Sequence, residues 1–301
     1  MLLATMATWG INLPVMKILL PVFGPQATPV LRMLCACALL SLVTWRVQRG
    51  WPRLSRQQWL VLVLCGAVMV YANQVFLMQG LRRTTATNAA LIMALNPLLS
   101  SLMAAMAFRL PIPRARWWGL ALGFGGVAAV VLHRPEAALG GGGLGDLLVL
   151  GSVATWVAGG VMVQRLGDPR TEGMDTGTLS WAVNMAGTAM LVLHFAFVGE
   201  PLLQPGATPG WSVAALLVMS GFLATAVGSL VWNRALATLG VSHVSLYVYW
   251  VPIFGVAFSV LLLGEPLTVW HLTGLAAVLG GTWLGTRGGV PAVAVVAEKP
   301  G

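Results

Sequence analysis

The chain has 301 residues, of which 58% are hydrophobic and only 8% are charged, and its mean hydropathy is +0.85. A soluble domain carries about 25% charged residues, and a surface this apolar would associate in water. The composition therefore excludes an ordinary soluble protein and favours a lipid bilayer as the solvent. The net charge of +9 does not indicate a nucleic-acid partner, because the basic residues stand between the apolar runs.

The apolar runs predict about ten membrane-spanning helices, since one span needs roughly 20 apolar residues. The strands of a membrane β-barrel are not expected, because these runs do not alternate between apolar and polar residues. We therefore expect an all-α integral membrane protein. In chain order, the predicted spans cover residues 1–20, 27–45, 59–80, 85–108, 115–132, 146–165, 177–198, 211–237, 242–263 and 268–286.

Arginines gather in alternate connections between the predicted spans. Basic connections face the cytoplasm in most membrane proteins, and this pattern predicts that both termini are cytoplasmic. Arg82 and Arg83 do not fit the pattern, because they fall in an outer connection. The residues that carry the pattern are Arg46, Arg49, Arg53, Arg56, Arg109, Arg114, Arg116, Arg165 and Arg170.

The two halves of the chain repeat each other. A shift of 155 residues aligns Pro97 with Pro252 and Gly119 with Gly274, and the tripeptide Ala-Thr-Trp occurs near the start of each half. We therefore expect two copies of about five spans each. Because five is odd, the second copy enters the membrane from the opposite side, as in inverted-repeat transporters. The expected divisions are a first repeat at 1–135, a Gly-rich linker at 136–144, a second repeat at 145–287 and a disordered tail at 288–301.

Several motifs resemble those of the drug/metabolite transporter superfamily, specifically its ten-helix EamA-type members. They are TWGIN at 8–12, Arg32, the NP and VP pairs at 96–97 and 251–252, and LLLGEPLT at 261–268 with the Gly-rich segment after it. The resemblance implies a carrier in the bacterial inner membrane, often an exporter of amino acids or related metabolites. The first repeat departs from the motif, with Leu110 at the position where the second has Glu265.

Polar and aromatic side chains within the spans are the candidates for a substrate cavity, because polar atoms in lipid need partners. For any one of them, an interhelical hydrogen bond or a place in the core is the alternative explanation. The prolines of the NP and VP pairs each remove a backbone donor, so we expect helix kinks with a role in gating at Pro97 and Pro252. The cavity candidates are Trp9, Asn12, Tyr71, Gln74, Asn88, Asn96, Trp156, Trp232, Arg234, His243, Tyr247 and Trp250.

Four further residues are expected to be structural. Arg32 lies near the outer end of its predicted span, where it can extend to the membrane surface; binding a substrate carboxylate is the alternative. Glu265 precedes the last span and is expected to balance the partial charge at the N-terminus of that helix; proton coupling is the alternative. Gly119 and Gly280 have the small-residue spacing that allows close helix packing.

No enzyme is expected, because the sequence contains neither paired Asp residues in adjacent spans nor an HExxH helix. Metal ligands, a cofactor and a nucleic-acid partner are not expected either, and Cys35, Cys37 and Cys65 are interpreted as packing residues. The expected partners are a small-molecule substrate and membrane lipid, with protons as a candidate coupling ion. An importer or facilitator of another metabolite, or a scaffold without transport activity, is the alternative.

Overall fold

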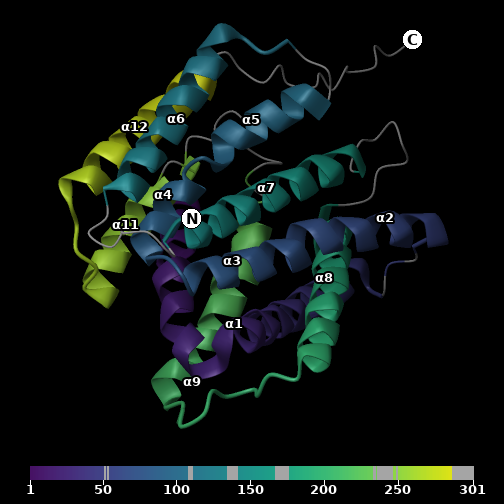
Figure 1. The fold of residues 1–301 in the computed structure, drawn as a ribbon. Helices are drawn as coiled ribbons and strands as arrows, with labels where there is room; N and C mark the ends of the chain where they lie inside the picture. The colour runs from purple at the N-terminus through teal and green to yellow at the C-terminus, as the bar shows by residue number, and fades with distance from the viewer. Residues whose placement is uncertain are drawn as a thin grey trace, which may run out of the picture.

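The computed structural model describes residues 1–50, 52, 54–107, 111–133, 142–166, 176–232, 235, 247–248 and 250–286. Every regular element in this part of the chain is helical, which confirms the all-α class (Figure 1). The elements are α1 (Leu2–Gln48), α2 (Arg56–Gly66), η1 (Ala67–Ala72), α3 (Asn73–Leu81), α4 (Ala86–Met93), α5 (Asn96–Ala107), α6 (Arg114–Leu132), α7 (Gly142–Leu166), α8 (Thr176–Val198), α9 (Trp211–Met219), η3 (Ser220–Val227), α11 (Trp250–Leu263) and α12 (Val269–Thr286).

Within the described ranges, six helical segments are long and apolar enough to cross a membrane, and α11 is a shorter apolar helix. This finding confirms a multi-pass membrane protein. The six segments are Leu2–Gln48, Arg56–Leu81, Ala86–Ala107, Gly143–Met162, Gly177–Val198 and Trp211–Trp232.

Helix α1 contains a sharp break at Gly24. Its 47 residues would measure about 70 Å as one straight helix, more than twice the roughly 30 Å of a hydrocarbon core. Gly24 has a φ of 74°, which a residue without a Cβ adopts at little cost, and Pro25 follows it. The break divides α1 into two arms that match the predicted spans at 1–20 and 27–45.

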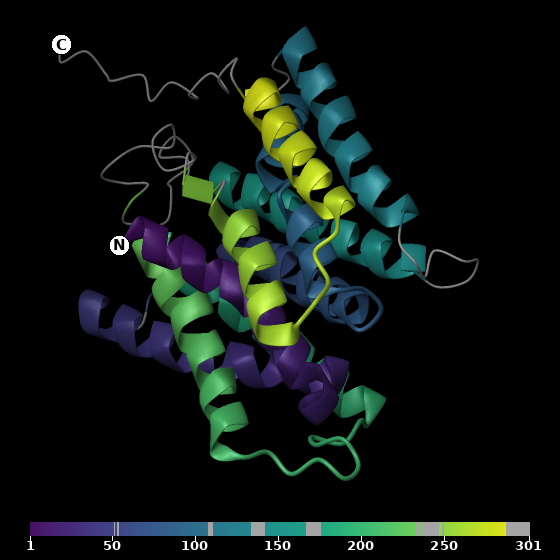
Figure 2. The ribbon, with the colours of Figure 1, turned by 90° about the vertical axis from the view of Figure 1, so that its left-hand side faces the viewer.

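The break in α1 marks one face of the molecule, which we call the kink face. The backbone N–H of Gln204, in the connection between α8 and α9, donates to the carbonyl of Val22 beside the break at 2.8 Å. The connections at 82–85 and 264–268 join each other on this face through Glu265, as described below. In Figure 2 the N-terminus lies on the opposite side of the bundle.

Two π-helical turns, η1 and η3, occur at equivalent places in the two halves. The shift of 155 residues aligns η1, at 67–72, with residues 222–227, which lie within η3. The same shift aligns the start of α6 at Arg114 with the start of α12 at Val269. Single π-turns inside α-helices are rare. Their occurrence at matched positions is a structural sign of an internal duplication.

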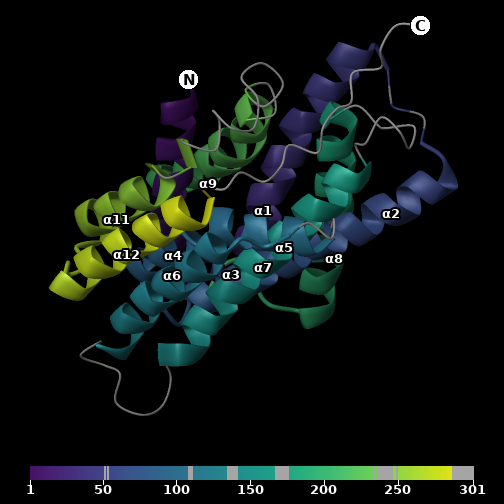
Figure 3. The ribbon, with the colours of Figure 1, turned by 90° about the horizontal axis from the view of Figure 1, so that it is seen from above.

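Helices α6 and α12 lie side by side at one edge of the bundle, where they are seen in Figures 1 and 3. A Cβ added at Gly119 would lie 2.4 Å from the carbonyl oxygen of Gly281, and one added at Gly126 would lie 3.0 Å from that of Gly274. The shift of 155 residues maps each of these pairs onto the other. Such reciprocal contacts are the mark of an interface around a two-fold axis. Gly280, which the sequence analysis singled out, is not at this contact; its added Cβ would meet only Leu122, at 3.9 Å.

Substituting alanine for Gly281 is therefore expected to destabilise the protein, whereas Gly280→Ala is the matched control. The new methyl of Gly281→Ala would lie 2.6 Å from the carbonyl of Gly119, which forces the helices apart at a cost of about 1–3 kcal/mol. Thermal unfolding in detergent checks this: the melting temperature should fall for Gly281→Ala and stay unchanged for Gly280→Ala. Equal melting temperatures for the two variants would contradict the close packing.

Candidate functional site

A buried arginine forms the centre of the candidate site. Arg32, on the second arm of α1, is only 2% exposed. Its Nε donates to Ser220 Oγ at 2.5 Å, its Nη1 lies 3.1 Å from Met16 Sδ and 3.5 Å from Gln74 Oε1, and its Nη2 lies 3.4 Å from Asn12 Oδ1. The structure thus corrects the expectation that Arg32 extends to the membrane surface. It lies eight residues beyond the break, or about 12 Å along the helix, and its side chain turns into the protein.

The arginine belongs to a chain of polar side chains, which we call the central network and define as Asn12, Arg32, Asn73, Gln74 and Ser220. Ser220 Oγ donates to Asn12 Oδ1 at 2.5 Å, and Gln74 Nε2 donates to Asn73 Oδ1 at 3.3 Å. Asn73 continues the chain to α7, where its Nδ2 donates to the carbonyl of Ser152 at 2.8 Å. The central network therefore ties both arms of α1 to α3, η3 and α7.

The partners of the Arg32 guanidinium are all neutral: an amide oxygen from each of Asn12 and Gln74, the hydroxyl of Ser220 and the thioether of Met16. A buried charge is costly unless it is paired. Hydrogen bonds from a guanidinium to a carboxylate are roughly twice as strong as those to neutral groups. The central network is therefore a place where an anionic group would be bound favourably.

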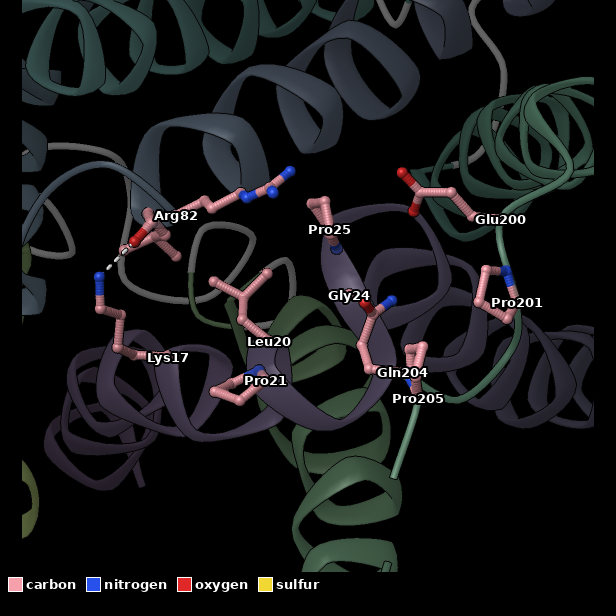
Figure 4. Close-up of a pocket in the computed structure, with 11 residues that line it drawn as sticks. Lys17, Leu20, Pro21, Gly24, Pro25, Arg82, Glu200, Pro201, Gln204 and Pro205 are labelled. Atoms are coloured by element: carbon pink, nitrogen blue, oxygen red, sulfur yellow. Dashed lines mark hydrogen bonds between the residues drawn. The ribbon is translucent and has the colours of Figure 1, made fainter. Parts of the chain in front are cut away.

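A pocket of about 500 Å³ lies at the kink face. On α1 its lining begins at Lys17, which is five residues, or about 7.5 Å along the helix, from Asn12 of the central network. Figure 4 shows the lining side chains. They are Lys17, Leu20, Pro21, Gly24, Pro25, Leu81, Arg82, Glu200, Pro201, Gln204 and Pro205.

The connection between α3 and α4 forms one wall of the pocket and is held by two charged side chains from other helices. Lys17 Nζ, from the first arm of α1, donates to the carbonyls of Leu81 and Thr84 at 2.5 Å each. Thr84 in turn donates its hydroxyl to Asp146 Oδ1 of α7 at 2.6 Å. These contacts satisfy carbonyls at the end of α3 that have no partner within the helix.

The same connection is held from the other side by Glu265. Its two carboxylate oxygens accept from the backbone N–H groups of Ala86 and Thr87, each at 2.8 Å, so the carboxylate caps α4. The sequence analysis had assigned it to the helix that begins at Val269, and the structure corrects this assignment. A carboxylate at a helix N-terminus is stabilised by the partial positive charge there, and Lys17 adds an attractive charge. Leu110, its counterpart in the first repeat, lies outside the described residues.

The remaining predicted cavity residues of the first half form separate contacts. Trp9 Nε1 donates to the carbonyl of Ala224 in η3 at 2.8 Å, and its ring lies 5.4 Å from that of Trp232. Tyr71 leaves the face of Gln74, since its hydroxyl lies 3.0 Å from His194 Nδ1 of α8. Of the predicted cavity residues that the structure describes, only Asn12 and Gln74 therefore join the central network.

Two predicted asparagines lie on α4 and α5. Asn88 is buried, and its Oδ1 lies 3.1 Å from His271 Nε2 of α12. Asn96 accepts from Ser100 Oγ at 3.1 Å within its own helix. Neither bond reaches the central network.

Three predicted aromatic residues of the second half are exposed: Trp156 at 41%, and Tyr247 and Trp250 to a similar degree. Trp232 is half-buried against Trp9. Arg234 and His243 lie outside the described residues.

The two proline positions differ in their surroundings. The helix is interrupted at 94–95, between α4 and α5, and Pro97 is the second residue of α5. The backbone N–H of Ala94 still reaches the carbonyl of Ala90 at 3.1 Å. Pro252 is buried in the first turn of α11. A helix break therefore precedes Pro97, as the missing donor of a proline requires.

The sequence analysis missed several residues of the site. Ser220 was one small hydroxyl within an apolar run, and Glu200 and Gln204 lie in a connection that carries no recognisable motif. Lys17 was not among the candidate residues. An intramembrane lysine is itself a signal for a buried role, and it could have indicated the contact with the α3–α4 connection.

A multi-pass helical protein with a buried cationic network beneath a pocket has the organisation of a membrane transporter for small solutes. A model of the EamA-like transporter family matches residues 1–132 and 143–287, so the chain belongs to this family. The protein is therefore an EamA-family transporter.

Two relatives match this chain over nearly its full length at low sequence identity. The chain is 24% identical over 268 residues to the "Uncharacterized transporter YyaM" of Bacillus subtilis, covering 86% of this chain and 83% of that protein. It is 26% identical over 296 residues to the "Probable terminal-alkyne amino-acid exporter" of Streptantibioticus cattleyicolor, covering 95% and 92%. A solved crystal structure superposes with a TM-score of 0.65 at 17% identity, covering 95% of each chain; this likeness shows the fold.

A further relative is matched over a shorter region. The "Probable amino-acid metabolite efflux pump" of Salmonella typhimurium is 22% identical over 204 residues, covering 66% of this chain and 67% of that protein.

Proposed function

We propose that this transporter exports small amphipathic metabolites such as amino acids, by alternating access between two inverted halves. The observation that carries the proposal is the central network, a buried cationic site with neutral partners beneath a pocket at one face. Amino-acid substrates are supported by the names of two relatives, the probable terminal-alkyne amino-acid exporter and the probable amino-acid metabolite efflux pump.

The alternating-access part of the proposal rests on how the central network is divided between the halves. Asn12 and Arg32 belong to the first half, whereas Ser220 belongs to the second. Rocking one half against the other separates these side chains. The hydrogen bonds of Ser220 to Arg32 and Asn12 would then form in one state, where they block the solute path below the pocket, and break in the other state, where the path is open.

The division into halves follows the expected boundaries, with a first repeat at 1–135, a linker at 136–144 and a second repeat at 145–287. Support comes from the matched π-turns, from the reciprocal glycine contacts between α6 and α12, and from the two separate matches of the family model. With the basic connections in the cytoplasm of a bacterial cell, the kink face is periplasmic and both termini are cytoplasmic.

Counterflow in proteoliposomes tests the proposed transport. Vesicles that contain the protein and are preloaded with an unlabelled amino acid should accumulate the labelled form from outside, while protein-free vesicles should not. A panel of the common amino acids identifies those exchanged. No accumulation of any member, with protein that remains monodisperse and folded, would contradict amino-acid transport.

A further inference from the structure

Two side chains of opposite charge face each other across the pocket at the kink face. Arg82 comes from the connection between α3 and α4 in the first half, and Glu200 from the connection between α8 and α9 in the second. Figure 4 shows the guanidinium and the carboxylate pointing toward one another from opposite walls. The space between them is part of the pocket of about 500 Å³, a volume within the usual range for small-molecule sites.

Among the described residues, neither charge has a partner. Glu200 Oε2 is buried and accepts no hydrogen bond from any of them, a state that costs free energy for a charged group. The guanidinium of Arg82 is exposed, and within the part of the chain that the structure describes it makes neither a hydrogen bond nor an ion pair. An arginine and a carboxylate in one pocket, each without a partner, are the complement of a ligand that carries both charges.

The two walls are held in place by other contacts. The connection that carries Arg82 is fixed by Lys17 and Glu265, as described above. Glu200 follows a turn at Gly199, which has a φ of 67°, and the bond from Gln204 to the carbonyl of Val22 anchors the same connection to α1. A site whose groups are positioned before binding loses less entropy when a ligand is bound.

We propose that this pocket is a recognition site for zwitterions, in which Arg82 binds a carboxylate and Glu200 binds an ammonium group. The apolar side chain of the ligand would lie against Leu20, Pro21 and Pro25. This inference rests on the proposed function and makes it more specific: the solute carries both charges at the kink face. A ligand with a single charge would leave one of the two groups unpaired.

Equilibrium dialysis with the purified protein tests the site independently of transport. The probes are the common amino acids and, for the tightest binder, its methyl ester, which lacks the carboxylate charge, and its N-acetyl derivative, which lacks the ammonium charge. The variants are Arg82→Gln and Glu200→Gln. Arg83→Gln is the matched control. Arg83 is adjacent to Arg82 and exposed, and its Nη1 donates to the carbonyl and to Oε1 of Gln79 in α3, at 2.8 Å each.

The expected result is a crossed pattern. Arg82→Gln should weaken binding of the amino acid and its N-acetyl derivative about tenfold or more and leave the methyl ester unchanged. Glu200→Gln should weaken the amino acid and the methyl ester and leave the N-acetyl derivative unchanged. Arg83→Gln should bind all three probes as the natural protein does.

Two results would overturn the inference. One is that the natural protein binds no common amino acid. The other is that both variants change the three probes equally, which would mean that Arg82 and Glu200 only pair with each other to close the pocket. A crossed pattern without counterflow would support the site and contradict the proposed transport, so the two proposals can fail separately.

Discussion

Glu265→Ala is expected to lower the free energy of unfolding by about 3 kcal/mol, the largest stability effect of the changes considered. The carboxylate accepts from two backbone N–H groups at the start of α4, and hydrogen bonds to a charged group contribute about 1.5–3 kcal/mol each, less where water reaches them. Its loss leaves these donors without a partner and removes the charge that attracts Lys17. Thermal and denaturant unfolding in detergent measure the change.

Glu265→Gln is the matched control for this prediction. The amide retains one acceptor oxygen for α4 but has no charge. The free energy of unfolding of Glu265→Gln should therefore lie between that of the natural protein and that of Glu265→Ala. The double variant Glu265→Ala with Lys17→Met should lose less unfolding free energy than the sum of the losses of the two single variants. The effects of substitutions are not additive when the two residues interact. Unchanged stability of Glu265→Ala would show that the cap does not contribute to the fold.

Arg32→Gln is expected to reduce the rate of counterflow roughly 100-fold, a loss of about 3 kcal/mol. The glutamine side chain is shorter and neutral, so it cannot reach Asn12, Gln74 and Ser220 together or offer a charge to a substrate carboxylate. Arg32→Lys keeps the charge without the planar fork of donors and should recover part of the rate. The measurement is the initial rate of counterflow, divided by the amount of folded protein, for the natural protein and the two variants.

Two further variants separate a role in transport from a role in folding. Ser220→Ala removes the two bonds that Ser220 makes to Arg32 and Asn12 and leaves the guanidinium in place, so it should alter the rate without removing substrate binding. Arg83→Gln, on the exposed connection, should transport normally. Normal rates for Arg32→Gln would exclude the central network from the transport path.

The positions of the spans could be predicted from the sequence because apolar length is a local property. The predicted boundary between the first two spans falls at Gly24, and the predicted start of the last span lies one residue from that of α12. The small-residue spacing also placed Gly119 at a helix contact, as the structure has it. The glycine of α12 that it meets is Gly281, the neighbour of the predicted Gly280, and one residue on a helix turns a side chain by about 100°.

The contacts of the charged residues could not be predicted from the sequence, because they join segments far apart in the chain. Arg32 meets a serine 188 residues away, and Glu265 caps a helix that begins 179 residues before it. In the sequence, the helix end nearest to Glu265 is the start of α12 at Val269. In the folded protein, the start of α4 lies closer to the Glu265 carboxylate, because the two halves pack together there.

Helical spacing also failed where the helix changes its period. Tyr71 and Gln74 are three residues apart, a spacing that places side chains on one face of an α-helix, but Tyr71 lies in the π-helical turn η1 and bonds His194. A π-turn accommodates an additional residue and so rotates the side chains on either side relative to α-helical spacing. No residue in the segment Ala-Val-Met-Val-Tyr-Ala marks such a turn in advance.

The glycine contacts between α6 and α12 have a consequence for the alternating-access cycle that we propose. In that cycle, an exchange of conformation between the two inverted halves would amount to a half-turn about the axis that relates them. The pairs Gly119–Gly281 and Gly126–Gly274 are carried onto each other by that operation, so the exchange requires no new geometry where they touch. These two helices can thus serve as a stationary pivot, while the break in α1 and the bonds of Ser220 absorb the movement.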